Sequence, residues 1–273
     1  LVDDSFVLDA DQALLDIDRH AGIELKVFNP YKRRSDKAGL RQILNLGDFH
    51  RLDHRMHNKV MVIDNQVAVV GGRNLADHYF GYDEKDNFRD LEVIAGGSIV
   101  QALARGFDTY WNDPWCFPVE TVMERRGELG SPETVDLHPI DAGEFPVETP
   151  AERLEDWLAI ARSAHGGSAT LLLDAPPDAD PDYATESPVQ VGAQLIAAID
   201  AAQTEVWLVS AYLIPSEELE SAMQRAIQRG VRVRILTNSI GSNNHLTAHA
   251  AYRRHVRTLV EMGVEVHEVR DDA

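Results

Sequence analysis

Apolar residues along the chain form short runs whose spacing changes between that of strands and that of helices. Residues 23–28 alternate apolar and polar side chains, as a half-buried strand does. Residues 60–63 and 67–70 are continuous apolar runs separated by a turn-forming Asp-Asn pair, and they predict a strand, a tight turn and a second strand. In residues 99–111 the apolar side chains fall on one helical stripe, which predicts an amphipathic helix that faces the core.

The last third of the chain alternates between expected helices and expected strands. This order is typical of α/β units, in which helices connect the strands of a mostly parallel sheet. A further strand-like run, residues 169–173, precedes this region, and residues 151–165 have a helical pattern. The expected elements are helices over 191–202, 217–229 and 248–262 and strands over 205–210, 231–236 and 264–269.

The two ends of the chain resemble each other in the order of their expected elements. In residues 1–28 and again in residues 235–269, a strand and a polar loop precede a helix, a glycine and a second strand. The glycine is Gly22 in the first copy and Gly263 in the second. The repeat predicts an α/β protein with two similar lobes, each a mixed, mostly parallel sheet flanked by helices.

We expect the two lobes to be joined by a connection rich in proline, glutamate and glycine. The first lobe covers residues 1–112, the connection covers residues 113–165, and the start of the second lobe covers residues 166–273. The connection has no clean strand or helix period over most of its length, which favours an irregular segment between domains.

Polar residues with catalytic potential surround the expected hairpin. They read His57-x-Lys59-x4-Asp64, followed by Gly71-Gly72-x-Asn74. This pattern resembles the signature of the phospholipase D superfamily, and its surroundings resemble the bacterial cardiolipin synthase branch. The matching surroundings are residues 28–30, 51–59, 71–74, 210–215 and 230–239.

The resemblance implies a phospholipase D-like fold and a phosphatidyltransferase that works through a phosphohistidine intermediate, without a cofactor. It also implies a phospholipid substrate such as phosphatidylglycerol. The protein would be bacterial and located at a membrane surface or in the cytoplasm, with its membrane anchor outside this chain. Phospholipid hydrolysis, nucleic-acid phosphodiester hydrolysis and non-catalytic binding of lipid or anions are the alternatives that the sequence leaves open.

The chemistry of a phosphodiester explains the residue types in the motif. A neutral imidazole attacks phosphorus without adding anionic repulsion and divides one difficult step into two, and His57 suits this role. Lys59, two residues later on a strand, shares the face of His57, so its ammonium can hold a phosphate oxygen. Asn74 can donate its amide to phosphate, while Gly71 and Gly72 permit close approach of the backbone to the anion.

Two acidic residues complete the candidate site. Asp64 belongs to the motif but lies at the far end of the apolar strand, about 17 Å from Lys59 at strand rise, so we interpret it as a residue that orders the turn. By resemblance, Asp90 lies where the family places a carboxylate on the imidazole of the nucleophile, which would fix the tautomer of His57. The alternative interpretation of Asp90 is a surface acid before a strand.

The reaction of the family uses a second His/Lys pair, whose histidine protonates the leaving oxygen. No second His-x-Lys occurs in the chain. Since His57 follows Gly22 by 35 residues, the same spacing after Gly263 would place a second motif about 25 residues beyond Ala273. We therefore expect a fragment that lacks the start of the first lobe and the end of the second, and that is inactive or nearly so by itself.

Charge limits the partners of the chain. The formal net charge is −19 and the pI is about 4.9, so the overall field repels nucleic acid and anionic lipid. A phosphate-bearing substrate therefore needs a local basic patch. Residues 31–55 are the basic exception, and we favour an anion-collecting rim over a solvated surface as their role. Their basic residues are Lys32, Arg33, Arg34, Lys37, Arg41, Arg51 and Arg55.

Histidine spacing makes a metal site a further alternative. His50, His54 and His57 are close in sequence, and His245 and His249 are four residues apart, which suits two metal ligands on one helix face. No His-Glu-x-x-His motif is present, and the basic surroundings of the first group disfavour a cation. We therefore expect no metal.

Overall fold

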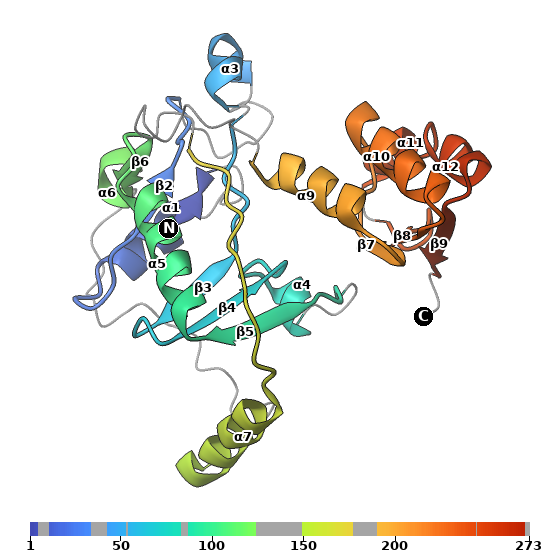
Figure 1. The fold of residues 1–273 in the computed structure, drawn as a ribbon. Helices are drawn as coiled ribbons and strands as arrows, with labels where there is room; N and C mark the ends of the chain where they lie inside the picture. Colours follow the sequence, from blue (N-terminus) through green and yellow to red (C-terminus); the bar gives the residue numbers. More distant parts are fainter. Residues whose placement is uncertain are drawn as a thin grey trace. The chain divides into compact units, whose positions relative to one another are not determined.

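The computed structural model describes residues 1–4, 11–33, 43–52, 54–82, 87–123, 149–176, 190–243 and 245–270. The chain divides into two compact units, residues 1–188 and residues 189–273 (Figure 1). The predicted α/β class, with sheets flanked by helices, is confirmed. Contacts group residues 166–188 with the first unit, and the lobe limits inferred from the sequence stay a prediction.

The first unit contains two three-stranded sheets. One has the strand order β1-β2-β6, in which β1 (Val2–Asp3) is parallel to β2 (Lys26–Phe28) and β2 is antiparallel to β6 (Cys116–Pro118). The other has the order β3-β4-β5, and both of its pairings are antiparallel. Its strands are β3 (Val60–Ile63), β4 (Val67–Gly71) and β5 (Glu92–Gly96).

The hairpin of β3 and β4 follows the sequence prediction. Its turn contains Asp64 and Asn65, whose φ angles of 51° and 54° lie in the left-handed region that aspartate and asparagine tolerate. Strands joined by so short a turn must run antiparallel, because a parallel pair needs a long crossover. The expected mostly parallel sheet is therefore wrong for this unit, where β1–β2 is the one parallel pair among the described strands.

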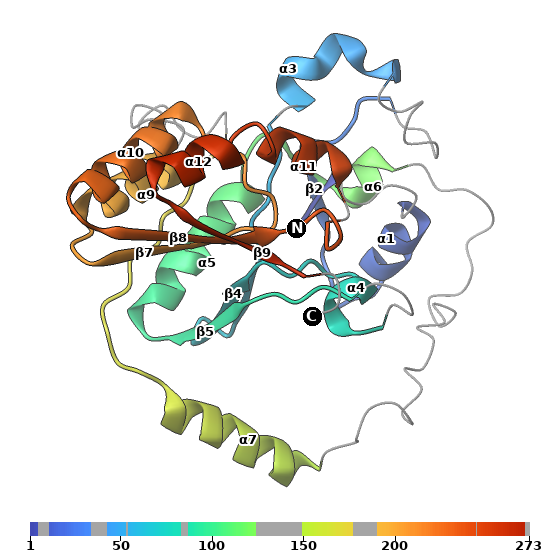
Figure 2. The same ribbon diagram turned by 90° about the vertical axis from the view of Figure 1, so that its right-hand side faces the viewer.

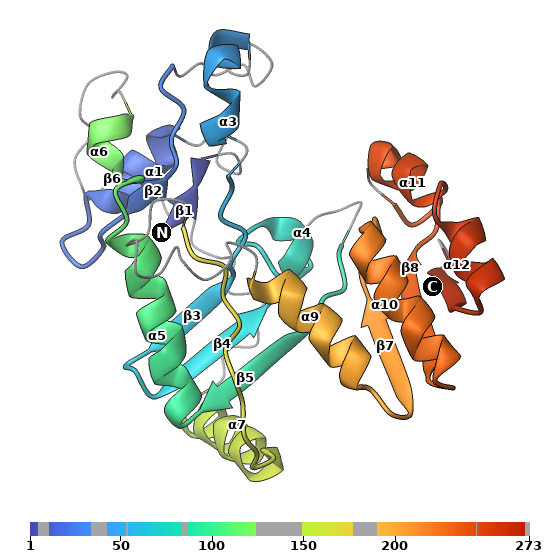
Figure 3. The ribbon, with the colours of Figure 1, turned by 45° about the horizontal axis from the view of Figure 1, so that its top comes forward.

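Helix α5 (Ser98–Trp111) packs on the β3-β4-β5 sheet (Figure 3). The predicted apolar stripe is confirmed, since Val100 and Leu103 are buried in one cluster with Ala68 of β4. Of the helices in the described part of the chain, none has the length and apolar character needed to cross a bilayer. The other helical segments of this unit are α1 (Asp11–Asp18), the 3-10 turn η2 (Leu46–Asp48), α3 (Phe49–Leu52), α4 (Asp77–Phe80), α6 (Val119–Val122) and α7 (Pro150–Ser163).

The segment that follows α7 packs on the first unit without forming a strand. Residues 169–173, which the sequence predicted to be a strand, have no strand pairing. Leu173 instead packs on the cluster of Phe28 and Tyr110, and the Tyr110 hydroxyl donates to the Asp174 carbonyl at 2.8 Å. The apolar residues of this segment therefore serve packing rather than a sheet.

The second unit is a three-stranded parallel sheet in the order β7-β8-β9, as the alternating pattern predicted. In Figure 2 its helices lie on one face of that sheet, and a single core cluster joins them to it. The strands are β7 (Glu205–Val209), β8 (Arg232–Asn238) and β9 (Glu265–Val269). The helices are α9 (Gln190–Ala201), α10 (Glu217–Gln228), α11 (Leu246–Tyr252) and α12 (Val256–Met262).

The single helix predicted over residues 248–262 is wrong, because the chain turns between α11 and α12. Arg253 and Arg254 lie in this turn, and His255 follows them. The His255 ring makes a 2.7 Å contact from Nδ1 to Glu220 Oε1 on α10, which a continuous helix pattern does not reveal. The break places two adjacent arginines at the surface of the unit.

Candidate active site

The predicted nucleophile lies in an extended segment that leads into β3. His57 is exposed, and Lys59 is the residue directly before the strand. Lys59 Nζ donates to the carbonyl oxygen of His57 at 3.0 Å. The Gly71 amide donates to the carbonyl of Lys59 at 3.4 Å, so the end of β4 adjoins the start of β3. The structure thus brings His57, Lys59 and the Gly71-Gly72 pair to one end of the hairpin.

A buried carboxylate from β1 fixes the chain just before His57. Asp3 is 4% exposed, and its Oδ2 accepts from the Met56 amide at 2.8 Å. Its Oδ1 accepts from Arg55 Nη1 at 3.0 Å. Asp3 is the last residue of the first strand of a parallel pair, and groups at the carboxyl ends of parallel strands meet at one edge. We did not single out Asp3 from the sequence, although its place at the end of a short strand was a usable signal.

Asn29, directly after β2, also fixes this segment. It is fully buried and has a left-handed φ of 50°. Its Nδ2 donates to the carbonyls of Arg51 at 2.9 Å and His54 at 2.6 Å, and its Oδ1 accepts from Arg51 Nη1. Because each of these bonds is made by a buried polar group, the backbone that ends at His57 has one well-defined path.

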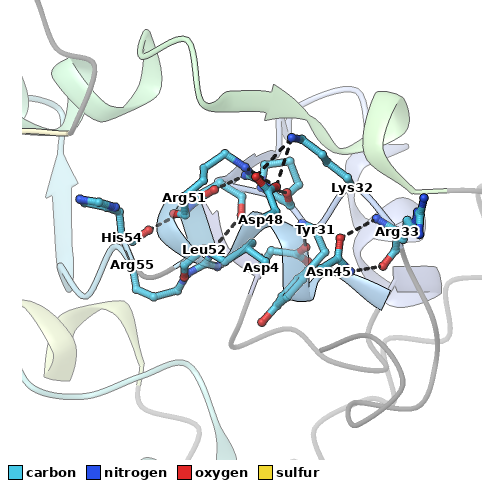
Figure 4. Close-up of polar contacts among 12 residues, drawn as sticks. Asp4, Tyr31, Lys32, Arg33, Asn45, Asp48, Arg51, Leu52, His54 and Arg55 are labelled. Atoms are coloured by element: carbon cyan, nitrogen blue, oxygen red, sulfur yellow. Dashed lines mark hydrogen bonds and ion pairs between the residues drawn. The ribbon is translucent and has the colours of Figure 1, made fainter. Parts of the chain in front are cut away.

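These contacts change the interpretation of the basic segment 31–55. Arg51 pairs with Asp48 at 2.7 Å (Figure 4). Arg55 pairs with Asp3 at 3.0 Å, so both guanidinium groups hold parts of the protein together. Lys32 lies 3.3 Å from Asp48. The expected anion-collecting rim is therefore wrong for Arg51 and Arg55, since Asp48 and Asp3 already pair with them. Lys32 shares Asp48 with Arg51 and its side chain is 69% exposed, so its part in such a rim stays a prediction. Three further basic residues of the proposed rim lie outside the described residues, namely Arg34, Lys37 and Arg41.

The electrostatic setting of His57 favours the neutral imidazole. Although His57 is exposed, the partial loss of water around its ring lowers its pKa below the usual value, and the positive charge of Lys59 lowers it further. The negative charge of Asp3 acts in the opposite direction and raises the pKa of His57. A neutral imidazole is the nucleophilic form, so the setting suits attack on an electrophile near neutral pH. Burial also lowers the pKa of Lys59, against the charge of Asp90, which raises it.

Asp90 lies against the glycine pair at the end of β4. A Cβ added to Gly72 would come within 2.4 Å of Asp90 Oδ1 and 2.5 Å of Oδ2, so only glycine leaves room for this carboxylate. Asp90 Oδ1 also accepts from the Leu91 amide at 2.7 Å. The charge of Asp90 acts on Lys59, whereas the acid whose charge raises the pKa of His57 is Asp3. The role of Asp90 as partner of the imidazole stays a prediction.

The remaining motif residues, Asp64 and Asn74, lie in different surroundings. Asp64 is exposed in the turn at the far end of β3, as expected for a residue that orders the turn. Asn74 Nδ2 donates to the Tyr79 hydroxyl at 3.0 Å. The neighbouring Arg73 donates from Nη1 to the Tyr79 carbonyl at 2.7 Å. Binding of phosphate by Asn74 therefore stays a prediction and would require its amide to leave Tyr79.

The described residues contain no group of three or more histidine, cysteine, aspartate or glutamate side chains arranged to hold a metal ion. The His54 ring packs edge-on against Trp115, with centroids 5.9 Å apart. The side chain of His50 lies outside what the structure describes. The expectation that no metal takes part stays a prediction.

Comparisons with known proteins relate the chain to lipid enzymes. The family described as cardiolipin synthase, PLD-like domain matches residues 195–273. The chain is 30% identical to cardiolipin synthase C of Escherichia coli (strain K12), over 99% of this chain and 57% of that protein. It is 33% identical to an uncharacterized protein of Helicobacter pylori (strain J99), over 93% of this chain and 50% of that protein. The chain thus spans about half the length of the curated relatives it matches.

A solved structure, the phosphatidylserine synthase of Haemophilus influenzae Rd KW20, is also similar. The two structures superpose over 80% of this chain and 49% of the phosphatidylserine synthase chain, with 13% sequence identity and a TM-score of 0.46. The sequence relatives extend over nearly the whole chain and include the His57 motif region, whereas the family match covers only the second unit.

The family match and the sequence relatives support the phospholipase D superfamily, as the motif predicted. Within that superfamily the chain is similar to the cardiolipin synthase-like branch, since its relatives include cardiolipin synthase C of Escherichia coli and a cardiolipin synthase of Halalkalibacterium halodurans that is 25% identical over 92% of this chain and 39% of that protein.

Proposed function

We propose that this chain supplies the nucleophile-bearing half of a bacterial phosphatidyltransferase similar to a cardiolipin synthase, with His57 as the nucleophile. The observation that carries the proposal is the geometry at the end of the hairpin: Lys59 Nζ donates to the His57 carbonyl at 3.0 Å, and the buried Asp3 holds the Met56 amide beside it at 2.8 Å. The lowered pKa of His57 supports the proposal, because it favours the neutral imidazole. The relatedness to cardiolipin synthases supports phospholipid as the substrate class.

In the proposed reaction an imidazole nitrogen of His57 attacks the phosphorus of phosphatidylglycerol. A P–N bond forms, the P–O bond to the head-group glycerol breaks, and glycerol leaves after it takes up a proton. A hydroxyl group of a second phosphatidylglycerol then attacks the phosphorus. The P–N bond breaks, the hydroxyl proton is released, and the products are cardiolipin and free enzyme. The resemblance assigns the proton transfers to a second histidine that this chain does not contain.

The other motif residues take positioning and charge roles in this proposal. Lys59 holds a non-bridging phosphate oxygen, and its lowered pKa reflects how far its ammonium is removed from water. Asp90 balances the charge of Lys59 from beside Gly72. Asp3 and Asn29 position the backbone that carries His57. We expect the enzyme to act at a membrane surface, since both of its proposed substrates are lipids.

The proposal is tested by assaying the protein expressed from its whole gene with vesicles that contain phosphatidylglycerol. We expect wild-type protein to form cardiolipin and glycerol, and His57→Gln protein to form neither. A covalent lipid–enzyme adduct that is labile in acid should be trapped on wild-type protein and be absent from the variant. Normal turnover by His57→Gln protein would refute the nucleophile assignment.

The same assay separates the alternative functions. Phosphatidic acid and glycerol without cardiolipin would identify a phospholipid hydrolase. Lipid binding without any product would identify a non-catalytic module. Cleavage of a nucleic acid with no lipid product would identify a nucleic-acid phosphodiesterase, which the net charge of −19 disfavours.

A further inference from the structure

The second unit contains a hollow that the proposed catalytic residues do not line. Its volume is about 510 Å³, and its lining residues are Ile240, Leu246, His249, Ala250, Arg253 and Arg254. It lies beyond the carboxyl end of β8, between the loop that leaves this strand and the α11–α12 turn. Ligands of parallel α/β sheets bind beyond the carboxyl ends of their strands, so its position is that of a binding site.

The two arginines at this hollow differ from the other arginines of the unit. No ion pair or side-chain hydrogen bond engages Arg253 or Arg254 within the residues that the structure covers, and both are exposed. By contrast, acidic side chains pair with Arg225, Arg229, Arg232, Arg234 and Arg257. Among the described residues, those that line the hollow include no acidic side chain. In a chain with a net charge of −19, two adjacent arginines without acidic partners form a local site for an anion.

A buried histidine in the wall of the hollow has a polar atom without a partner. His249 is 8% exposed, and its Nδ1 makes no hydrogen bond to any described residue. The ring of Tyr252 lies beside it, with centroids 5.7 Å apart, but the Tyr252 hydroxyl hydrogen-bonds to Glu268 at 2.9 Å and not to this nitrogen. Buried polar atoms are nearly always hydrogen-bonded in folded proteins. A ligand oxygen in the hollow would provide the missing partner once the ring turned towards it.

The rim of the hollow is apolar. Leu246 is 68% exposed and Ile240 is 61% exposed, so two aliphatic side chains that a hydrocarbon could contact adjoin the arginines. A ligand that fits the whole surface therefore carries an anionic group for the arginines and a hydrocarbon part for the rim. A glycerophospholipid has both parts in one molecule.

We propose that this hollow binds the phosphate of a glycerophospholipid, with Arg253, Arg254 and His249 on the phosphate and with Ile240 and Leu246 against the glycerol-proximal acyl chains. The choice of lipid rests on the proposed function. Binding itself requires no turnover, so it is measured in a His57→Ala background, and failure of the phosphatidyltransferase proposal would leave the binding result intact.

The experiment measures co-flotation of the 273-residue chain with vesicles of phosphatidylcholine alone or with phosphatidylglycerol added. We expect Arg253→Ala and Arg254→Ala each to weaken binding to phosphatidylglycerol vesicles about five-fold, the usual contribution of one basic residue at an anionic membrane. The matched control is Arg257→Ala on α12, which removes the same charge from a side chain that is 84% exposed and paired with Glu261. An equal loss in the control would mean general attraction and would overturn the site.

A second arm distinguishes a lipid head group from free phosphate. We expect Leu246→Ser to weaken vesicle binding and to leave the weak binding of inorganic phosphate unchanged. Suppose instead that inorganic phosphate binds as tightly as the vesicles and that Leu246→Ser affects neither ligand. The hollow would then be a site for a soluble phosphate compound, and the lipid proposal would be overturned. Unchanged vesicle binding in both arginine variants would overturn it as well. Circular dichroism of each variant checks that the fold is kept.

Discussion

At the scale of single residues, the protonation of His57 is set by two opposing neighbours. Lys59 lowers the pKa of His57, in addition to the larger effect of burial, and Asp3 raises it. The sequence predicted His57 and Lys59 because they belong to one short motif. It did not predict Asp3, since a contact between residues more than fifty positions apart depends on the fold.

The pKa of His57 can be measured in this chain by NMR titration, with His57→Gln to assign the signal. We expect a pKa below the ordinary value of about 6.5. Lys59→Met should raise the pKa of His57, because it removes a positive charge that disfavours the imidazolium. Asp3→Asn should lower it, because it removes a negative charge that favours the imidazolium. Equal pKa values in all three proteins would contradict the electrostatic account, and Asp64→Asn serves as the distant control.

Gly72 and Asp90 provide a second test at the residue scale. A Cβ at Gly72 would overlap the Asp90 carboxylate, so Gly72→Ala should lower the free energy of unfolding by about 1–3 kcal/mol. In an Asp90→Ala background the same change should cost less, because the clashing carboxylate is gone. Urea unfolding of the four proteins gives the coupling energy.

The control for this cycle is Gly22→Ala. An added Cβ there meets no atom within 4 Å, so we expect a change in unfolding free energy within about 0.5 kcal/mol. Additive effects of the two substitutions at Gly72 and Asp90 would mean that the carboxylate can move away without cost.

At the scale of elements, the β3–β4 hairpin places the catalytic motif. Its two apolar runs and its turn residues were readable from the sequence because strand period and turn chemistry are local properties. The antiparallel direction of the first unit's second sheet follows from the same turn. The break between α11 and α12 was missed, since the apolar spacing of the two helices continues across it.

The turn itself predicts a pattern of stability changes. Asn65 has a φ of 54°, a region that glycine enters freely and a β-branched residue enters at a cost of about 1–2 kcal/mol. We therefore expect Asn65→Val to lower the free energy of unfolding by about that amount, and Asn65→Gly to keep or raise it. Chemical denaturation measures both. Gln66→Ala, at a turn position without a positive φ, should change little, and an equal loss there would contradict the argument.

At the scale of the whole molecule, the two units differ in strand direction. The second unit has the parallel sheet that alternating helices and strands predict, whereas the first combines a short mixed sheet with an antiparallel one. The weak repeat between the two ends of the chain therefore extends to the strand–helix–strand order and not to the complete sheets. The basic segment 31–55 also could not be interpreted from composition alone. Composition does not show that Asp48 pairs with Arg51 and that Asp3 pairs with Arg55.

Metal dependence is a property of the whole protein and separates covalent histidine catalysis from metal-assisted hydrolysis. We expect EDTA to leave phosphatidyl transfer by the protein from the whole gene within about two-fold of the untreated rate, since an imidazole nucleophile needs no Lewis acid. The measurement is cardiolipin formation before and after dialysis against EDTA. Loss of activity that Zn²⁺ or Ca²⁺ restores would contradict this expectation and support a metal site.

The sequence by itself determined the motif, the hairpin that presents it, the amphipathic helix α5 and the α/β class, because all of these depend on residue types at short spacing. Only the tertiary structure decided that the charge of Asp3 acts on His57, that Arg51 and Arg55 pair within the protein, and that Arg253 and Arg254 line a hollow with His249. The physical reason is that a charge acts on whatever the folded chain places beside it. Distance in space, unlike spacing in sequence, is fixed only when the core has packed.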